Sequence, residues 1–316
     1  MKTPQLSLVI PAFNEAESLP TLFQEIDAVC RAEKIDYEVI VIDDGSRDAT
    51  FAEVEKAGLQ NPRIQGMRFR RNSGKAAALA EGFRRVNGEI VITMDADLQD
   101  NPTEIPLLIA KLNEGWDLVS GWKSVRHDPW HKTWPSKLFN AATVAASGLK
   151  LHDFNCGLKA YRREVVGTLN LYGELHRYIP VLAHWNGFRV TEKPVDHRAR
   201  RFGKSKYGLA RLNNGLFDLI TLLFLHRYTR RPLHLFGFVG LLFSVLGFTI
   251  LSGFALDWLL TGDLHLRPLM LGGVASMIVG IQFVSIGLLG EMINHRFSDA
   301  PPPLQTLTSG ISARQG

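Results

Sequence analysis

Apolar residues in the first hundred positions form short β-branched runs that alternate with stretches of helical spacing. The short runs predict strands at 6–10, 37–42, 64–69 and 89–94. Apolar residues three and four positions apart predict amphipathic helices at 15–32, 49–57 and 74–86. This alternation is typical of a mostly parallel α/β sheet. Later elements are less regular: a helix from 101, a strand at 116–120, a helix near 135–146 and a strand-turn-strand over 185–195.

The pattern changes near residue 230, where two long apolar stretches begin. Leu235 to Leu256 and Leu269 to Gly290 contain no charged side chain. Each gives about 33 Å of helix, enough to cross the hydrocarbon core of a bilayer. We therefore predict a two-helix transmembrane hairpin. The alternative is a hydrophobic hairpin buried inside a soluble domain.

Basic residues lie outside the two stretches. Arg227, Arg230 and Arg231 precede the first, and His295 and Arg296 follow the second. Because cytoplasmic flanks carry the excess of positive charge, both termini and the first domain are expected in the cytoplasm. The chain is thus predicted to be a multi-pass protein of the inner (cytoplasmic) membrane.

The predicted domains follow from these boundaries. An α/β domain occupies 1–206, an interfacial amphipathic helix region 207–232, the two transmembrane helices 233–292, and a partly disordered cytoplasmic tail 293–316. The apolar stripe that begins at Leu209 would also suit a helix of a soluble core. Its place between a basic loop and a membrane span favours the interfacial interpretation.

Charge and cysteine content narrow the classes of function. The net charge of +5 and the pI near 9.2 could indicate nucleic-acid binding. The basic residues cluster beside apolar segments, however, which favours membrane lipids or a phosphate substrate and no nucleic acid. Cys30 and Cys156 form neither metal spacing nor a disulfide framework, as expected in a reducing cytoplasm. No signal peptide is expected before the first strand.

Acidic residues follow three of the predicted strands. Asp95-Ala96-Asp97 ends the run at 89–94, and Asn14-Glu15 and Asp43-Asp44 end two others. Ligands of open α/β sheets bind beyond the carboxyl ends of the strands. Two carboxylates one residue apart repel each other unless a cation lies between them, and oxygen ligands suit Mg²⁺ or Mn²⁺. The alternative is a solvated Asp-rich turn. No Gly-x-Gly-x-x-Gly or Gly-Lys-Ser/Thr loop supports dinucleotide or P-loop binding.

Four motifs resemble one enzyme family. They are Ser7–Glu15, Val41–Asp48, Asn72–Ala76 and Met94–Asp100. Their order and spacing resemble family-two inverting glycosyltransferases, most closely the polyprenyl-phosphate group that includes dolichyl-phosphate mannose synthase, bactoprenol glucosyltransferases and the undecaprenyl-phosphate aminoarabinose transferase. The resemblance extends to about Asp299. It implies a GT-A (Rossmann-like, mostly parallel) catalytic domain followed by the transmembrane hairpin, assembled as a homo-oligomer, by analogy a tetramer.

The resemblance also implies roles for residues. Donor-binding residues would be Pro11, Asn14, Glu15, Asp43, Asp44, Lys75, Asp95, Ala96 and Gln99. The Mg²⁺ or Mn²⁺ ligands would be Asp95, Asp97 and Gln99. Catalytic residues would be Asp97, Asp153 and Arg201. The acceptor phosphate would be bound by Lys123, Arg126, Lys132, Ser136, Lys137, Arg201 and Lys206.

Each assignment has a structural alternative. Lys75 could be a surface helix lysine, and Asn14 with Glu15 could be a helix N-cap and its first-turn carboxylate. The basic residues around 123–137 and 197–207 could belong to solvated loops.

The implied reaction is metal-dependent, inverting transfer of one sugar from a nucleotide-diphosphate sugar to a polyprenyl (undecaprenyl) phosphate. The Gln-x-x-Arg-Trp motif of processive relatives is absent, which favours a single transfer. We expect a UDP-hexose such as UDP-glucose, although glucose, mannose, N-acetylglucosamine and a modified pentose all stay open. Two rivals are a transferase for another lipid or a protein acceptor, and a non-catalytic membrane scaffold that binds a nucleotide sugar.

Overall fold

The computed structural model describes residues 3–123, 140, 143–145, 147–198, 232–262 and 268–297. Residues 294–297 are described by their backbone alone. The chain divides into two compact units, Met1–Asp218 and Leu219–Gly316. Each unit is described by itself.

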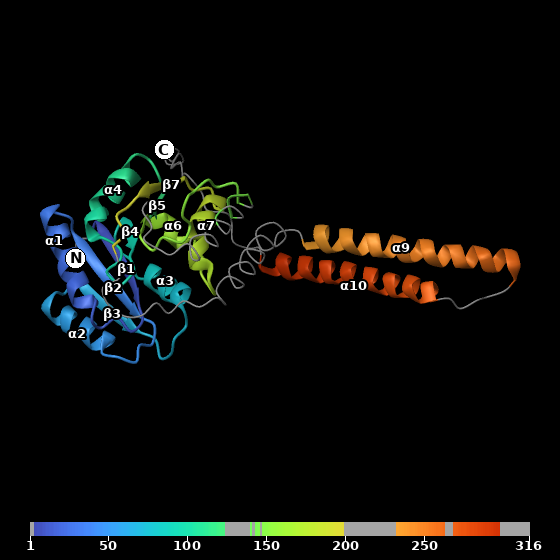
Figure 1. Ribbon diagram of the computed structural model, residues 1–316, viewed down its shortest axis with the longest axis horizontal. Coiled ribbons are helices and arrows are strands. Elements are labelled where there is room, and N and C mark those ends of the chain that lie inside the picture. The colour runs from blue at the N-terminus through green and yellow to red at the C-terminus, as the bar shows by residue number, and fades with distance from the viewer. Residues whose placement is uncertain are drawn as a thin grey trace, which may run out of the picture. The chain divides into compact units, whose positions relative to one another are not determined.

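The first unit is built on a seven-stranded sheet with the order β3-β2-β1-β4-β6-β5-β7 (Figure 1). Its strands are β1 (Leu6–Ala12), β2 (Tyr37–Asp43), β3 (Ile64–Arg68), β4 (Ile90–Thr93), β5 (Leu118–Trp122), β6 (Lys159–Arg162) and β7 (Val190–Pro194). The first four strands run parallel, β6 runs antiparallel to β4 and β5, and β7 runs parallel to β5. The mostly parallel sheet confirms the predicted fold class.

Helices cover both faces of this sheet. They are α1 (Leu19–Ala32), α2 (Thr50–Gln60), α3 (Lys75–Phe83), η1 (Pro102–Glu104), α4 (Ile105–Asn113), α6 (Arg163–Gly167), η2 (Leu175–Tyr178) and α7 (Ile179–Trp185). Alternating residues of β2 explain the two layers: Val39 and Val41 join the core under α1 and α4, whereas Ile40 and Ile42 join the cluster under α3. Burial on both sides accounts for the continuous apolar runs in the sequence.

Two predictions about elements are wrong. The helix expected from residue 15 begins at Leu19, because residues 14–18 form a turn held to the β2–α2 connection. Over 185–195 only β7 is a strand, since Trp185 ends α7 and the chain reverses at Gly187, whose φ of +91° suits glycine. Short helices such as α7 lack the repeated apolar period that identifies longer ones.

The second unit is a helical hairpin of α9 (Pro232–Thr261) and α10 (Pro268–Phe297). Both helices are long and apolar enough to span a membrane, by length and composition. Glycines recur at seven-residue intervals where they meet: Gly240 and Gly247 on α9, Gly273 and Gly280 on α10. A Cβ at Gly240 would lie 2.7 Å from the Gly280 carbonyl oxygen, so the backbones are in contact.

The predicted interfacial helix, apart from Pro232, and most of the helix near 135–146 lie outside the described residues, as does the tail after Phe297.

Candidate active site

The loops that follow β1 and β2 are joined at the carboxyl edge of the sheet. Asn14 has a φ of +52°, its amide donates to Ser46 Oγ (2.8 Å), and its Oδ1 accepts from the Arg47 amide (2.8 Å). The Glu15 amide donates to Thr50 Oγ1 (2.8 Å). Neither residue caps α1, so the N-cap alternative is wrong. Pro11 lies within β1, in register with Ile42.

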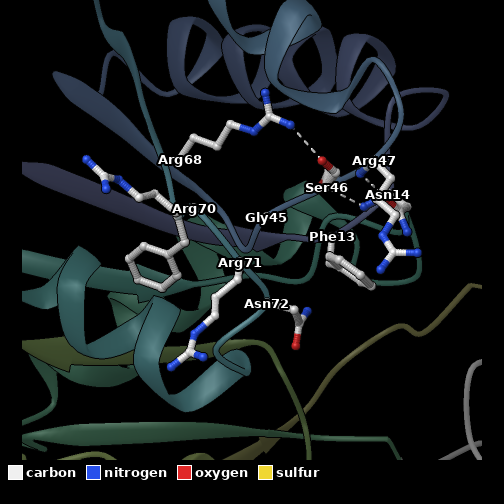
Figure 2. A pocket seen from close by; sticks show the side chains of 10 residues that line it. Phe13, Asn14, Gly45, Ser46, Arg47, Arg68, Arg70, Arg71 and Asn72 are labelled. Carbon is white, nitrogen blue, oxygen red and sulfur yellow. Dashed lines mark hydrogen bonds between the residues drawn. The ribbon is translucent and has the colours of Figure 1, made fainter.

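An open cavity of about 630 Å³ lies at this edge (Figure 2). Its lining combines two aromatic rings, two amides and four guanidinium groups, contributed by Phe13, Asn14, Gly45, Ser46, Arg47, Arg68, Phe69, Arg70, Arg71 and Asn72. Figure 2 shows Arg68 and Arg70 on one side of the opening and Phe13 and Asn14 on the other. The composition suits a flat polar ring with attached anionic groups.

Asp43 and Asp44 shape the cavity through different contacts. Asp43 is buried; its carboxylate accepts from the Ser46 amide (2.8 Å) and pairs with Arg68 (3.2 Å). Asp44 accepts from the amides of Ser73 (2.6 Å) and Gly74 (2.9 Å). Burial raises the pKa of Asp44, although these amide hydrogen bonds oppose the rise. Asp44 thereby fixes the loop that leads from the cavity into α3.

Lys75, the first residue of α3, pairs with the carboxylate of Asp95. The Lys75 side chain, 30% exposed, is thus tied to the acidic loop. Burial works to raise the pKa of Asp95, but the charges of Lys75, Lys123 and Lys159 outweigh it and hold the pKa well below its usual range. Asp95 stays ionised in a cluster of cations.

The acidic loop after β4 is folded tightly. Leu98 is buried with a φ of +61°, the left-handed region that side chains rarely adopt. Asp97 accepts from the Gln99 amide (3.2 Å), and Gln99 Nε2 donates to the Arg198 carbonyl (3.4 Å), which leaves the Gln99 Oε1 for other contacts. Asp100 accepts from the Asp95 amide (3.0 Å). Ala96 is buried beneath the loop.

The turn that contains Asp153 packs against Asp95. A Cβ at Gly157 would lie 2.5 Å from Asp95 Oδ2, so only glycine permits this approach. Thr93 Oγ1 donates to the Gly157 carbonyl (2.8 Å) and ties the turn to β4. Asp153 is 1% exposed and accepts from the Asn155 amide (2.9 Å). The insertion of β6 between β4 and β5 brings this turn to the acidic loop.

Two lysines lie among the carboxylates. For Lys123, burial favours a lower pKa, but Asp100, Asp95 and Asp153 outweigh it and raise the pKa, so the ammonium stays charged. Lys159 is 3% exposed and donates to the Cys156 carbonyl. Burial lowers the pKa of Lys159, with Asp153 and Asp95 opposing the shift. The two lysines therefore place positive charge next to the acidic loop, on the side where the loop joins the sheet.

The segment after β7 crosses the acidic loop. Asp100 and His197 form an isolated antiparallel bridge, and the Arg198 amide donates to the Gln99 carbonyl (2.9 Å). The Arg198 guanidinium binds Glu25 and Asn101 (both 2.7 Å). The predicted basic loop thus starts beside Gln99. Its residues Arg201 and Lys206, and also Arg126, Lys132, Ser136 and Lys137, lie outside the described residues.

Sequence reasoning missed several residues of this site. The arginines of the cavity, Lys159 and His197 received no individual role, and Asp100 was noted only as the end of a motif. Arg70 and Arg71 directly follow a predicted strand, which is a signal that could have identified them. Lys159 and His197 gave no comparable signal, because both lie far in sequence from the acidic loop that they approach.

This architecture, a mostly parallel sheet whose β4 is followed by an Asp-x-Asp-x-Gln loop that residues 195–198 (the strap) cross, defines a GT-A glycosyltransferase domain. Residues 7–169 match glycosyl transferase family 2. Over 303 residues the chain is 37% identical to the undecaprenyl-phosphate 4-deoxy-4-formamido-L-arabinose transferase of Enterobacter sp. (strain 638), covering 93% of this chain and 90% of that protein. The chain belongs to glycosyl transferase family 2 and is a glycosyltransferase.

Solved structures share the fold. Glucosyl-3-phosphoglycerate synthase from Mycobacterium tuberculosis in complex with Mn²⁺ and UDP-glucose is 21% identical, with a TM-score of 0.55 over 71% of this chain and 79% of that one. The same enzyme in complex with phosphoglyceric acid gives 22% identity and a TM-score of 0.54, covering 71% and 80%. At this identity the likeness concerns the fold.

Proposed function

We propose that the protein transfers one sugar from a nucleotide-diphosphate sugar to a polyprenyl phosphate, with inversion and with a divalent metal ion. The observation that carries this proposal is the meeting of three segments at one edge of the sheet: the acidic loop 95–100, the Asp153 turn and the strap 195–198. The relative from Enterobacter, named for undecaprenyl phosphate, supports the acceptor class.

The nucleotide of the donor would occupy the arginine-lined cavity. Phe13 offers a ring for the base, Asn14 and Asn72 offer amides, and the arginines offer charge to the phosphates. The loop from Asn72 to Lys75 leads from this cavity to Asp95, so a diphosphate would reach the acidic loop along a path that ends at the Lys75 ammonium. The donor is expected to be a UDP-sugar; a hexose is our first expectation.

The residues of the acidic loop fit a hard divalent cation. Two carboxylates and the carboxamide oxygen of Gln99 are its possible ligands, because Gln99 Nε2 is already used as a donor. Bound there, Mg²⁺ or Mn²⁺ would stabilise the charge of the leaving diphosphate.

The acceptor phosphate would bind to Lys123 and to the basic residues that follow Arg198. A phosphate monoester has a second pKa near 6, so at neutral pH it is a nucleophile without the help of a base. Its attack on the anomeric carbon breaks the bond to the diphosphate in one displacement and inverts the carbon. The main barrier is the approach of two anions, which Lys75, Lys123 and the basic residues that follow Arg198 would lower.

The hairpin α9–α10 would hold the enzyme in the inner membrane with its catalytic unit on the cytoplasmic side, where a long polyprenyl chain is available. We also propose that the enzyme forms a homo-oligomer, which by analogy with its family would be a tetramer.

The test is transfer by purified full-length protein in nanodiscs. A panel of labelled nucleotide sugars is offered with undecaprenyl phosphate, with undecaprenol and diacylglycerol as acceptor controls. We expect an acid-labile lipid product only with the phosphate, lost with EDTA and restored by Mn²⁺. Product from diacylglycerol alone would favour the other acceptor class, and metal-independent nucleotide binding without turnover would favour the scaffold.

A further inference from the structure

A chain of polar contacts runs from Lys123 to the acidic loop. Lys123 Nζ lies 3.2 Å from His197 Nε2. His197 Nδ1 lies 3.8 Å from Asp100 Oδ1, and Asp100 Oδ2 accepts from the Asp95 amide at 3.0 Å. His197 thus stands between the lysine assigned to the acceptor phosphate and the loop assigned to the donor.

The chemistry of the three groups determines where the imidazole proton lies. A lysine ammonium can only donate, so Nε2 must accept from Lys123, and the neutral ring then carries its proton on Nδ1. Nδ1 is buried and has no hydrogen-bond partner among the described residues; the nearest carboxylate is Asp100, which is 2% exposed. Asp100 therefore favours the Nδ1–H tautomer electrostatically, which is the less common form of neutral histidine.

The backbone holds His197 in this place. The Asp100–His197 bridge and the Arg198-to-Gln99 hydrogen bond attach the strap to the acidic loop. Asp196 is also held, since its amide donates to Glu104 Oε1 (3.0 Å) and its carboxylate accepts from Asn101 Nδ2 (3.2 Å). The Val195 amide donates to the Trp122 carbonyl (3.0 Å), next to Lys123. His197 is therefore set between two segments that are both fixed.

We propose that His197 and Asp100 are positioning residues that join Lys123 to the acidic loop, so that the acceptor phosphate is held in register with the donor. Without His197, the Lys123 ammonium would turn to the carboxylates around it and offer fewer N–H groups to the phosphate. This inference rests on the proposed function, because it assigns Lys123 to the acceptor.

Two substitutions separate positioning from packing. Gln places an amide oxygen or nitrogen near the position of Nε2, whereas Asn places one near Nδ1. We expect His197→Gln to change the acceptor KM less than threefold, and His197→Asn to raise it about tenfold, a typical cost of one lost charge-assisted hydrogen bond. The donor KM should change less than twofold in both. His184→Gln, on an exposed face of α7, is the matched control.

A double-substitution cycle adds a second criterion. His197→Asn should raise the acceptor KM little further when Lys123→Met is already present, because the two residues act through one contact. Additive effects, or equal loss from His197→Gln and His197→Asn, would overturn the proposal and leave His197 a packing residue.

A third measurement does not need the acceptor. In full-length protein labelled with ¹⁵N-histidine, the signal that disappears in His197→Gln belongs to His197. We expect the Nδ1–H tautomer at neutral pH, and a shift toward Nε2–H in Lys123→Met. An Nε2–H ring in the wild type contradicts the inference. If the wild type makes no phosphate-linked product, the proposed function fails, and this spectrum still decides the tautomer and contact.

Discussion

At the scale of single residues, the site depends on close contacts between distant segments and on a balance between its carboxylates and its lysines. The Asp95 carboxylate lies against Gly157 on one side and Lys75 on another, and the charges of Lys75, Lys123 and Lys159 keep it ionised. The acidic motif was predicted from its position at a strand end. Its surroundings were not predictable, because Gly157 and Lys159 reach it only through the pairing of β6 with β4.

Substitutions of Asp97 and Asp153, the two acidic residues proposed to be catalytic, should lower kcat by different amounts. Asp97→Ala removes a ligand of the proposed metal and should lower kcat about 10²–10³-fold. Asp153→Asn should lower it less than about tenfold, because the acceptor phosphate is already deprotonated. Steady-state kinetics with both substrates checks this. Equal losses of kcat would show that Asp153 carries a catalytic task as large as that of the metal.

Gly157 provides a second prediction at this scale. Gly157→Ala places a methyl group 2.5 Å from Asp95 Oδ2 and must displace the carboxylate. We expect kcat to fall about 10²-fold, since a small misplacement in an active site has effects of that order. Gly167→Ala, where an added Cβ meets nothing within 4 Å, is the control. Full activity in Gly157→Ala would mean that Asp95 can move without consequence.

At the scale of elements, the hairpin shows how glycine spacing controls helix packing. Gly240 lies against Gly280, and Gly247 lies against Gly273. Phe283 stacks between Phe236 and Phe243 at ring distances of 6.2 Å. The sequence predicted two spans but not which faces meet, because lipid-facing and helix-facing residues are equally apolar.

Gly280→Leu tests this packing. The side chain would enter the space occupied by the Gly240 backbone and force the helices apart, at a cost of about 1–3 kcal/mol. We expect a lower midpoint of thermal unfolding for full-length protein in detergent, followed by circular dichroism. Gly272→Leu adds the same side chain where nothing lies within 4 Å and should leave the midpoint unchanged. Equal midpoints for the two variants would contradict the glycine contact.

At the scale of the whole molecule, charge distribution determines how transfer depends on pH. The raised pKa of Lys123 keeps its charge well beyond neutral pH, because a cation retains its proton below its pKa. The acceptor phosphate becomes dianionic as pH rises through about 6. We therefore expect kcat/KM for the acceptor to rise between about pH 5 and 7 and to show no loss from Lys123 up to about pH 9. A fall between pH 7 and 8 would indicate a different titrating group.

Local pattern determined much of this protein: the parallel strands, the acidic loop at a strand end, and the two membrane-length helices each follow from nearby residues. Periodicity, turn residues and side-chain length are properties of adjacent positions, so the sequence reports them directly. Tertiary structure decided the insertion of β6, the pairing of Lys75 with Asp95, the arginine-lined cavity and the contact of His197 with Lys123 and Asp100. These depend on strand order and on segments far apart in the chain, such as those of Asp100 and His197, and their interaction energies are set by distance and burial, which no local pattern contains.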